Sequence, residues 1–147
     1  MHAGILVDES HAPLLLMRVG NRVNVDDMNR YTSDLDRVLA FRKPFTAMVL
    51  VRERGELDRK VVGIYGEWTR RNVSAIEQYW LGAAFVFPNE MLRFLLSAIL
   101  LAAPTATPHQ VFSKTDAALR WCDSRLALAG LSAPRLDDAT LWGALVR

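Results

Sequence analysis

The side chains that could do chemistry are few, and their spacing matches no catalytic or metal-binding pattern. The three histidines, His2, His11 and His109, share no metal-ligand spacing, so we interpret them as loop residues. The single cysteine, Cys122, follows Trp121 in a helical pattern. A nucleophilic cysteine would need a histidine partner and a lowered pKa, and the sequence indicates neither. We therefore interpret Cys122 as a packing residue.

Two glycines and three carboxylates are the remaining candidates for a phosphate-binding loop or a catalytic carboxylate pair. Gly63 and Gly66 lack the G-x-x-x-x-G-K-[ST] spacing of a phosphate loop, and we interpret them as points of close backbone approach. Asp123 and the pair Asp137-Asp138 are interpreted as solvated or capping carboxylates. The sequence thus predicts a protein that is not an enzyme and has no metal site and no cofactor. An enzyme would require residues that distant parts of the chain bring together.

Composition places the chain among globular proteins. Its 147 residues suit one domain, and 51% hydrophobic with 23% charged residues is typical of a packed core. The net charge of +2 is far from the clustered positive charge of a nucleic-acid binder, so no nucleic-acid partner is expected. One cysteine excludes an intrachain disulfide and fits the reducing cytoplasm, where we expect the protein to reside.

No segment predicts membrane targeting. Asp8 and Glu9 interrupt the apolar start of the chain, unlike a signal peptide. The apolar run 94–103 has ten residues, whereas a span needs about 20. We therefore expect a buried helix there and no membrane span.

Apolar periodicity predicts an alternation of strands and helices. Strand 45–51 carries no charge, which is typical of a central strand covered on both faces. Asn24 is the expected N-cap of the first helix, and Pro44 predicts its end near Phe41. Ser113 and Asp116 form a variant capping box before the last helix, which Gly130 closes. The predicted strands are 5–7 and 14–19 (a hairpin), 45–51, 83–87 and 110–112, and the predicted helices 24–41, 89–102 and 113–128.

The segment 57–80 allows two interpretations. Its apolar residues share one helical face, and Gly82 suits the end of such a helix. Against a helix stand Gly63 and Gly66, each of which costs roughly 1 kcal/mol relative to alanine. The alternative is a strand over 61–65 that pairs with strand 45–51. We favour one long helix.

These elements predict an α/β domain with a single-layer mixed sheet of about 4–5 strands and helices packed on it. We expect this domain to cover residues 1–130. A C-terminal tail, 131–147, would follow it, with a linker at 131–135 and a short amphipathic segment at 137–146.

The order of elements resembles the STAS fold of anti-sigma-factor antagonists (SpoIIAA-like proteins) over residues 4–128. The likeness is carried by Val25-Asp26-Asp27-Met28 after a hairpin, the Pro44-led strand, 83–87, and 111–113 followed by Ala117-Ala118-Leu119-Arg120-Trp121. The resemblance implies a non-catalytic protein–protein interaction module in bacterial regulation. Phosphorylation-switched members carry a serine-containing turn after the central strand. Here the matching segment 52–58 holds no Ser or Thr, which removes the hydroxyl that a kinase would modify.

A mixed-charge segment, 52–60, marks the expected partner-binding site. It follows the central strand, and ligands of open α/β sheets bind at the carboxyl ends of strands. The resemblance places docking on this loop and on helix 58–79. The candidate partner-binding residues are Arg52, Arg54, Glu56, Asp58 and Arg59, with Trp142 of the tail as an interface aromatic.

Segment 89–102 leaves an alternative function open. It is apolar nearly all round, which indicates burial on more than one side. The segment could line a pocket for an apolar small molecule or lipid, or form a homodimer seam.

Overall fold

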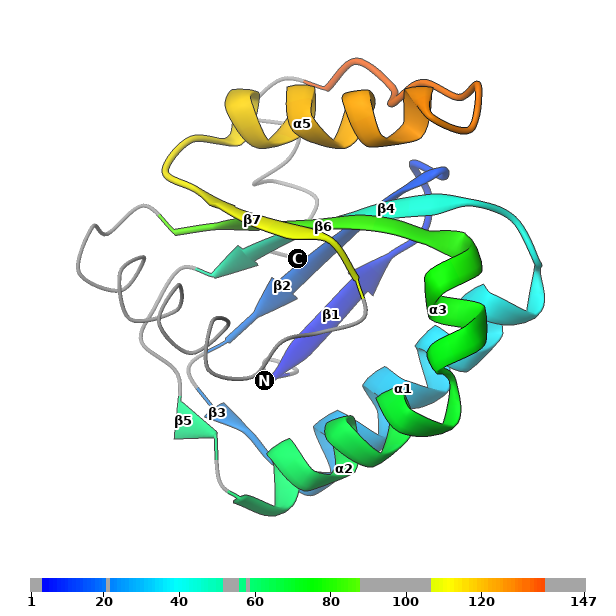
Figure 1. Ribbon diagram of the computed structural model, residues 1–147. Helices are drawn as coiled ribbons and strands as arrows, with labels where there is room; N and C mark the ends of the chain where they lie inside the picture. Colours follow the sequence, from blue (N-terminus) through cyan, green and yellow to red (C-terminus); the bar gives the residue numbers. More distant parts are fainter. Residues whose placement is uncertain (1–3, 21, 52–55, 58, 88–106, 137–147) are drawn as a thin grey trace.

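The computed structural model describes residues 4–20, 22–51, 56–57, 59–87 and 107–136, which form a three-layer α/β domain (Figure 1). Helices α1, α2 and α3 cover one face of the sheet and α5 covers the other. The strands are β1 Ile5–Asp8, β2 Leu14–Val19, β3 Arg22–Val23, β4 Phe45–Val51, β5 Glu56–Leu57, β6 Trp80–Val86 and β7 His109–Phe112. The described helices are α1 Val25–Ala40, α2 Arg59–Arg71, α3 Val73–Tyr79 and α5 Thr115–Ala127.

The main sheet has five strands in the order β1-β2-β4-β6-β7. β1 pairs antiparallel with β2, and all other neighbours in this sheet are parallel. This mixed sheet with helices packed on it confirms the predicted fold class. β4 lies at its centre with every residue buried, which confirms a central strand covered on both faces.

The start of α1 follows the sequence prediction. The Asp27 N–H donates to Asn24 Oδ1 at 2.8 Å, and the Asn24 N–H donates to Asp27 Oδ2 at 3.0 Å. This reciprocal pair is a capping box, and it satisfies donors that the first helical turn leaves free. The helix ends with Phe41 as its C-cap, where Pro44 predicted the end.

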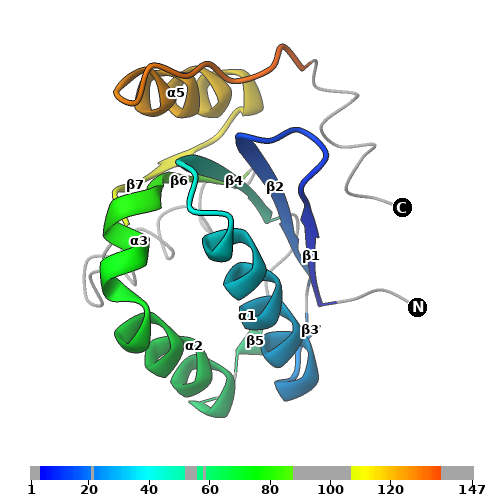
Figure 2. The ribbon, with the colours of Figure 1, turned by 90° about the vertical axis from the view of Figure 1, so that its right-hand side faces the viewer.

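The prediction of one continuous helix over 57–80 is wrong: residues 59–79 form two helices, and Leu57 and Trp80 belong to strands. α2 ends at Arg71 and α3 begins at Val73, while the Asn72 side chain donates to the Trp68 carbonyl at 2.9 Å. A side chain that bonds the preceding turn competes with the regular helical pattern, and the helix axis changes direction here (Figure 2). The alternative strand over 61–65 is excluded.

Gly82 lies inside β6, so its predicted place at the end of the long helix is wrong. A Cβ atom at this position would lie 2.8 Å from Cη2 of Trp121 in α5. Glycine therefore allows α5 to pack directly on the strand, a tertiary requirement that the local sequence does not reveal.

Of the two predicted ends of α5, the first is wrong and the second is confirmed. The predicted cap on Ser113 is wrong, because the helix begins at Thr115 after Lys114 and has no side-chain cap. The predicted closure at Gly130 is confirmed. Its φ of 74° lets the Leu131 N–H donate to the Leu126 carbonyl at 3.0 Å, which satisfies a free carbonyl of the last turn.

The core has two halves because successive side chains of a strand point to opposite faces of the sheet. Leu15 and Met17 of β2 pack with α1 to α3, whereas Leu14 and Leu16 pack on the α5 side. Leu136, at the end of the described chain, also packs on the α5 side. The predicted helix 89–102 and the tail segment 137–147 lie outside the described residues.

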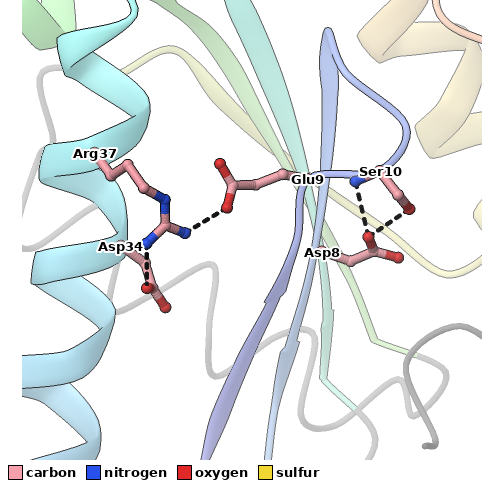
Figure 3. A network of polar contacts seen from close by, with 5 residues as sticks. All are labelled: Asp8, Glu9, Ser10, Asp34 and Arg37. Atoms are coloured by element: carbon pink, nitrogen blue, oxygen red, sulfur yellow. Dashed lines mark hydrogen bonds and ion pairs between the residues drawn. The ribbon is translucent and has the colours of Figure 1, made fainter.

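A polar network joins the β1–β2 turn to α1 at the amino edge of the parallel strands (Figure 3). Arg37 of α1 pairs with Glu9 of the turn and donates to Asp34 at 3.2 Å. Asp8 accepts from both the N–H and the hydroxyl of Ser10, at 2.9 and 2.6 Å. Because Arg37 is half exposed, we attribute to these ion pairs the alignment of the turn and little stability.

Candidate docking surface

The carboxyl edge of the sheet is capped by a short ribbon that the sequence did not predict. β3 pairs in parallel with β5, with Arg22 opposite Glu56 and Val23 opposite Leu57. Strands of two residues are too short to show the alternation by which strands are predicted. Below the ribbon, Val23 packs with Val61, so the beginning of α2 is held beside that of α1.

Of the predicted partner-binding residues, Arg59 is the one whose backbone and side chain both belong to the described part of the chain. Arg59 is the first residue of α2 and is exposed at this edge. The backbone of Glu56 belongs to β5. Its side chain, together with Arg52, Arg54, Asp58 and Trp142, lies outside the described residues.

The inner face of α2 is held against α1 by aromatic side chains. The rings of Tyr31 and Tyr65, and those of Tyr65 and Trp68, stack with centroids 5.9 Å apart. Trp68 Nε1 donates to Asp36 Oδ1 of α1 at 2.7 Å. Burial raises the pKa of Tyr65 to about 12 and that of Tyr31 well above its usual value, so both phenols stay neutral. These residues give α2 a fixed position.

The outer face of α2 carries two glycines among three exposed side chains. We define it by Arg59, Val62, Gly63, Gly66 and Arg70, which fall within about 100° of one another at 100° per residue. Val62 is 55% exposed. A Cβ added to Gly63 would have no neighbour within 4 Å, and one at Gly66 only Arg70 Nη1 at 3.8 Å. The interpretation of these glycines as close approaches within the chain is therefore wrong, because they face outward.

The spacing of the two glycines was a usable signal for this face. Gly63 and Gly66 stand three residues apart on a helix whose apolar residues define the opposite side. This spacing indicates that both glycines lie on the outer face of the helix.

Cys122 is a packing residue, as predicted. It is fully buried on α5, and its thiol donates to the Ala47 carbonyl at 3.7 Å. Burial raises the pKa of Cys122 to about 12. The thiolate that a nucleophile or metal ligand requires is thus almost absent at neutral pH.

We expect the Cys122 thiol of the native protein to react with an aromatic disulfide reagent at pH 8 at least about 100-fold more slowly than the thiol of the urea-unfolded chain, whose pKa is near 8.5. Absorbance of the released thiolate measures both rates. The mutant Cys122→Ser, which lacks the thiol, provides the baseline. Equal rates in the two states would contradict the buried, protonated thiol.

The described histidines and Asp123 contact structural groups. His11 Nε2 lies 3.9 Å from Asp8 Oδ2, and His109 Nδ1 lies 3.2 Å from the Thr107 carbonyl. Asp123, inside α5, accepts from the N–H of Ala133 at 2.7 Å, so it contacts the segment after the helix and does not cap a helix end. Within the described ranges, no three His, Cys, Asp or Glu residues gather closely enough to hold a metal ion.

Comparison with known structures shows which fold this arrangement represents. An uncharacterized protein of the DUF3478 family from Shewanella loihica PV-4, described as having a SpoIIAA-like fold, superimposes with a TM-score of 0.63. The likeness covers 83% of this chain and 96% of that one, at 16% sequence identity. This chain has a SpoIIAA-like fold.

The SpoIIAA-like fold confirms the resemblance inferred from the order of elements. At this identity the likeness concerns the fold alone. No protein-family model matches the sequence, and no curated protein matches it either. Among the described helices of this SpoIIAA-like domain, none is long and apolar enough to span a bilayer.

Proposed function

We propose that the protein is a non-catalytic, cytoplasmic protein-interaction module of the STAS type in bacterial regulation. The outer face of α2 and the adjoining segment 52–58 would dock its partner. The observation that carries the proposal is the outward position of Gly63 in a SpoIIAA-like fold. Because segment 52–58 has no Ser or Thr, regulation would not use phosphorylation there.

Glycines on the outer face of a helix lower the stability of the helix, so we attribute their presence to contact with a partner outside the chain. Each costs about 1 kcal/mol relative to alanine, and no packing of described residues offsets it at Gly63. At Gly63, where no side chain projects from the helix and no neighbour lies within 4 Å of a Cβ, a partner backbone can come close. Val62 supplies an apolar contact at the edge of the bare surface. Arg59 and Arg70 flank it with positive charge, which favours an acidic rim on the partner.

The mutant Gly63→Arg tests the proposal without damaging the fold. Its side chain would extend into open space, and arginine favours the helix over glycine, so thermal stability should be preserved. We expect recovery of the specific partner to fall at least about tenfold, because an added side chain at an interface centre separates the two surfaces. Affinity capture from a lysate of the source organism, quantified by mass spectrometry, measures the recovery.

The matched control is Ser74→Arg, which adds the same side chain at an exposed position of α3. It should recover the same partners as the unmodified protein. Equal recovery by Gly63→Arg and Ser74→Arg would exclude the outer face of α2 as the docking surface.

The apolar segment 89–102, on which the alternative of an apolar ligand or a homodimer rests, lies outside the described residues. That alternative stays a prediction from the sequence. Native mass spectrometry of the purified protein detects either a bound ligand or a dimer.

A further inference from the structure

Arg18 is a nearly buried arginine on the α5 side of the sheet. Its side chain is 9% exposed although it lies in β2, next to the centre of the main sheet. Leu14 and Leu16, two and four residues before it, pack on the α5 side, so the alternation of the strand places Arg18 there as well. The cross-strand neighbours of Arg18 are Leu6 and Leu50.

The guanidinium of Arg18 lacks a counter-charge within the described part of the chain. Its Nε is buried without an acceptor, and no carboxylate of a described residue pairs with the side chain. Two other arginines of the domain show the usual pairing. Arg125 Nε donates to the Leu81 carbonyl at 2.8 Å, and Arg30 Nη2 donates to Asp27 at 3.0 Å. A buried donor without an acceptor is unfavourable, so the unmet Nε of this nearly buried arginine indicates an anion that binds the side chain.

The position of Arg18 along the strand also suits a ligand. It stands one residue before the end of β2, at the carboxyl edge where open α/β sheets bind ligands. The residues level with it across the sheet are all apolar: Leu6, Leu50, Val86 and Phe112. α5 packs on β4, β6 and β7, away from β1.

We propose that Arg18 anchors a binding site for a small aliphatic carboxylate. A guanidinium presents two parallel N–H donors that match the two oxygens of a carboxylate. The apolar neighbours favour a ligand with one charge and a hydrocarbon group, because further charges would lose their hydration without finding partners. The site lies on the opposite face of the sheet from α2, so it is independent of the proposed docking surface.

Octanoate is a suitable probe, and thermal unfolding reports its binding. We expect octanoate at about 100 times its Kd to raise the Tm of the unmodified protein by about 5–10 °C. Neither 1-octanol, which lacks the charge, nor inorganic phosphate, which lacks the chain, should match this rise. Phosphate acting alone, or 1-octanol acting as well as octanoate, would overturn the proposal.

The mutant Arg18→Met keeps the length of the side chain and removes its charge. Without ligand, its Tm should equal or exceed that of the unmodified protein, because no partner loses an interaction. With octanoate, its Tm should not rise. Arg37→Met, at the half-exposed arginine of the turn network, should keep the full octanoate response.

Two results with these variants would overturn the proposal. A Tm of ligand-free Arg18→Met several degrees below that of the unmodified protein would show that a carboxylate of this chain pairs with Arg18. An unchanged octanoate response in Arg18→Met would show that binding occurs elsewhere. Arg18→Lys keeps the charge but loses the paired donors, and its apparent octanoate affinity should fall at least about tenfold.

Discussion

Replacing Trp68 with alanine is expected to lower the free energy of unfolding by about 3–5 kcal/mol. Trp68 is 1% exposed and is one of the largest fully buried side chains. It stacks on Tyr65 and donates to Asp36, so it joins α2 to α1. The alanine mutant loses the transfer free energy of the indole and leaves a cavity that its neighbours fill only in part.

Urea denaturation followed by circular dichroism measures this loss. Trp68→Phe is the matched control, because it keeps an aromatic ring in the same place and loses only the hydrogen bond and part of the volume. We expect the phenylalanine mutant to lose about 1–2 kcal/mol. A Trp68→Ala mutant within about 1 kcal/mol of the unmodified protein would mean that α2 is not held to α1 by this residue.

Gly4→Ala is expected to lower the free energy of unfolding by about 2–3 kcal/mol. A Cβ at this position would lie 2.5 Å from the Arg22 carbonyl and would also overlap Oδ2 of Asp27. The carbonyl belongs to the backbone of β3 and cannot rotate away. The carboxylate of Asp27 is held in the capping box of α1.

The charge state of Asp27 explains why this contact is sensitive. Burial raises the pKa of Asp27, but hydrogen bonds from the N–H groups of Asn24 and Gly4 and the contact with Arg30 outweigh that effect and lower it. The carboxylate is thus ionised at neutral pH. Displacing it would separate the start of β1 from that of α1.

Gly63→Ala provides the comparison for Gly4→Ala. The same change at Gly63 meets no neighbour and should stabilise the protein by about 0.5–1 kcal/mol through helix propensity. Urea denaturation of both mutants measures the two changes in the free energy of unfolding, which should have opposite signs. Equal changes at the two glycines would contradict the close approach at Gly4.

The parts of the fold that were predictable depend on interactions within a few residues. The capping box of Asn24, the end of α1 before Pro44 and the hairpin from β1 to β2 each follow from neighbours in sequence. The apolar run 45–51 predicted a central strand because only such a strand is buried on both faces. The order of these elements was enough to predict the SpoIIAA-like fold.

The errors fall where a residue's role depends on a distant segment. Glycine is needed at position 82 of β6 because Trp121, 39 positions later, packs on it, and no local pattern indicates that contact. The β3–β5 ribbon pairs Arg22 with Glu56 and Val23 with Leu57, residues that lie far apart in the sequence. For the candidate site, the sequence placed Arg59 at the correct edge of the sheet but interpreted the neighbouring glycines wrongly.

The sequence alone determined the fold class, the order of the main strands and helices along the chain and the absence of a hydroxyl in segment 52–58, since these depend on local pattern and composition. Only the tertiary structure decided which surfaces face outward and which charges are buried. Gly63 is bare because α2 turns its other side to α1, and Arg18 is orphaned because the sheet buries it among leucines. Exposure and charge pairing are set by segments far apart in the chain, and for that reason both functional proposals needed the folded molecule.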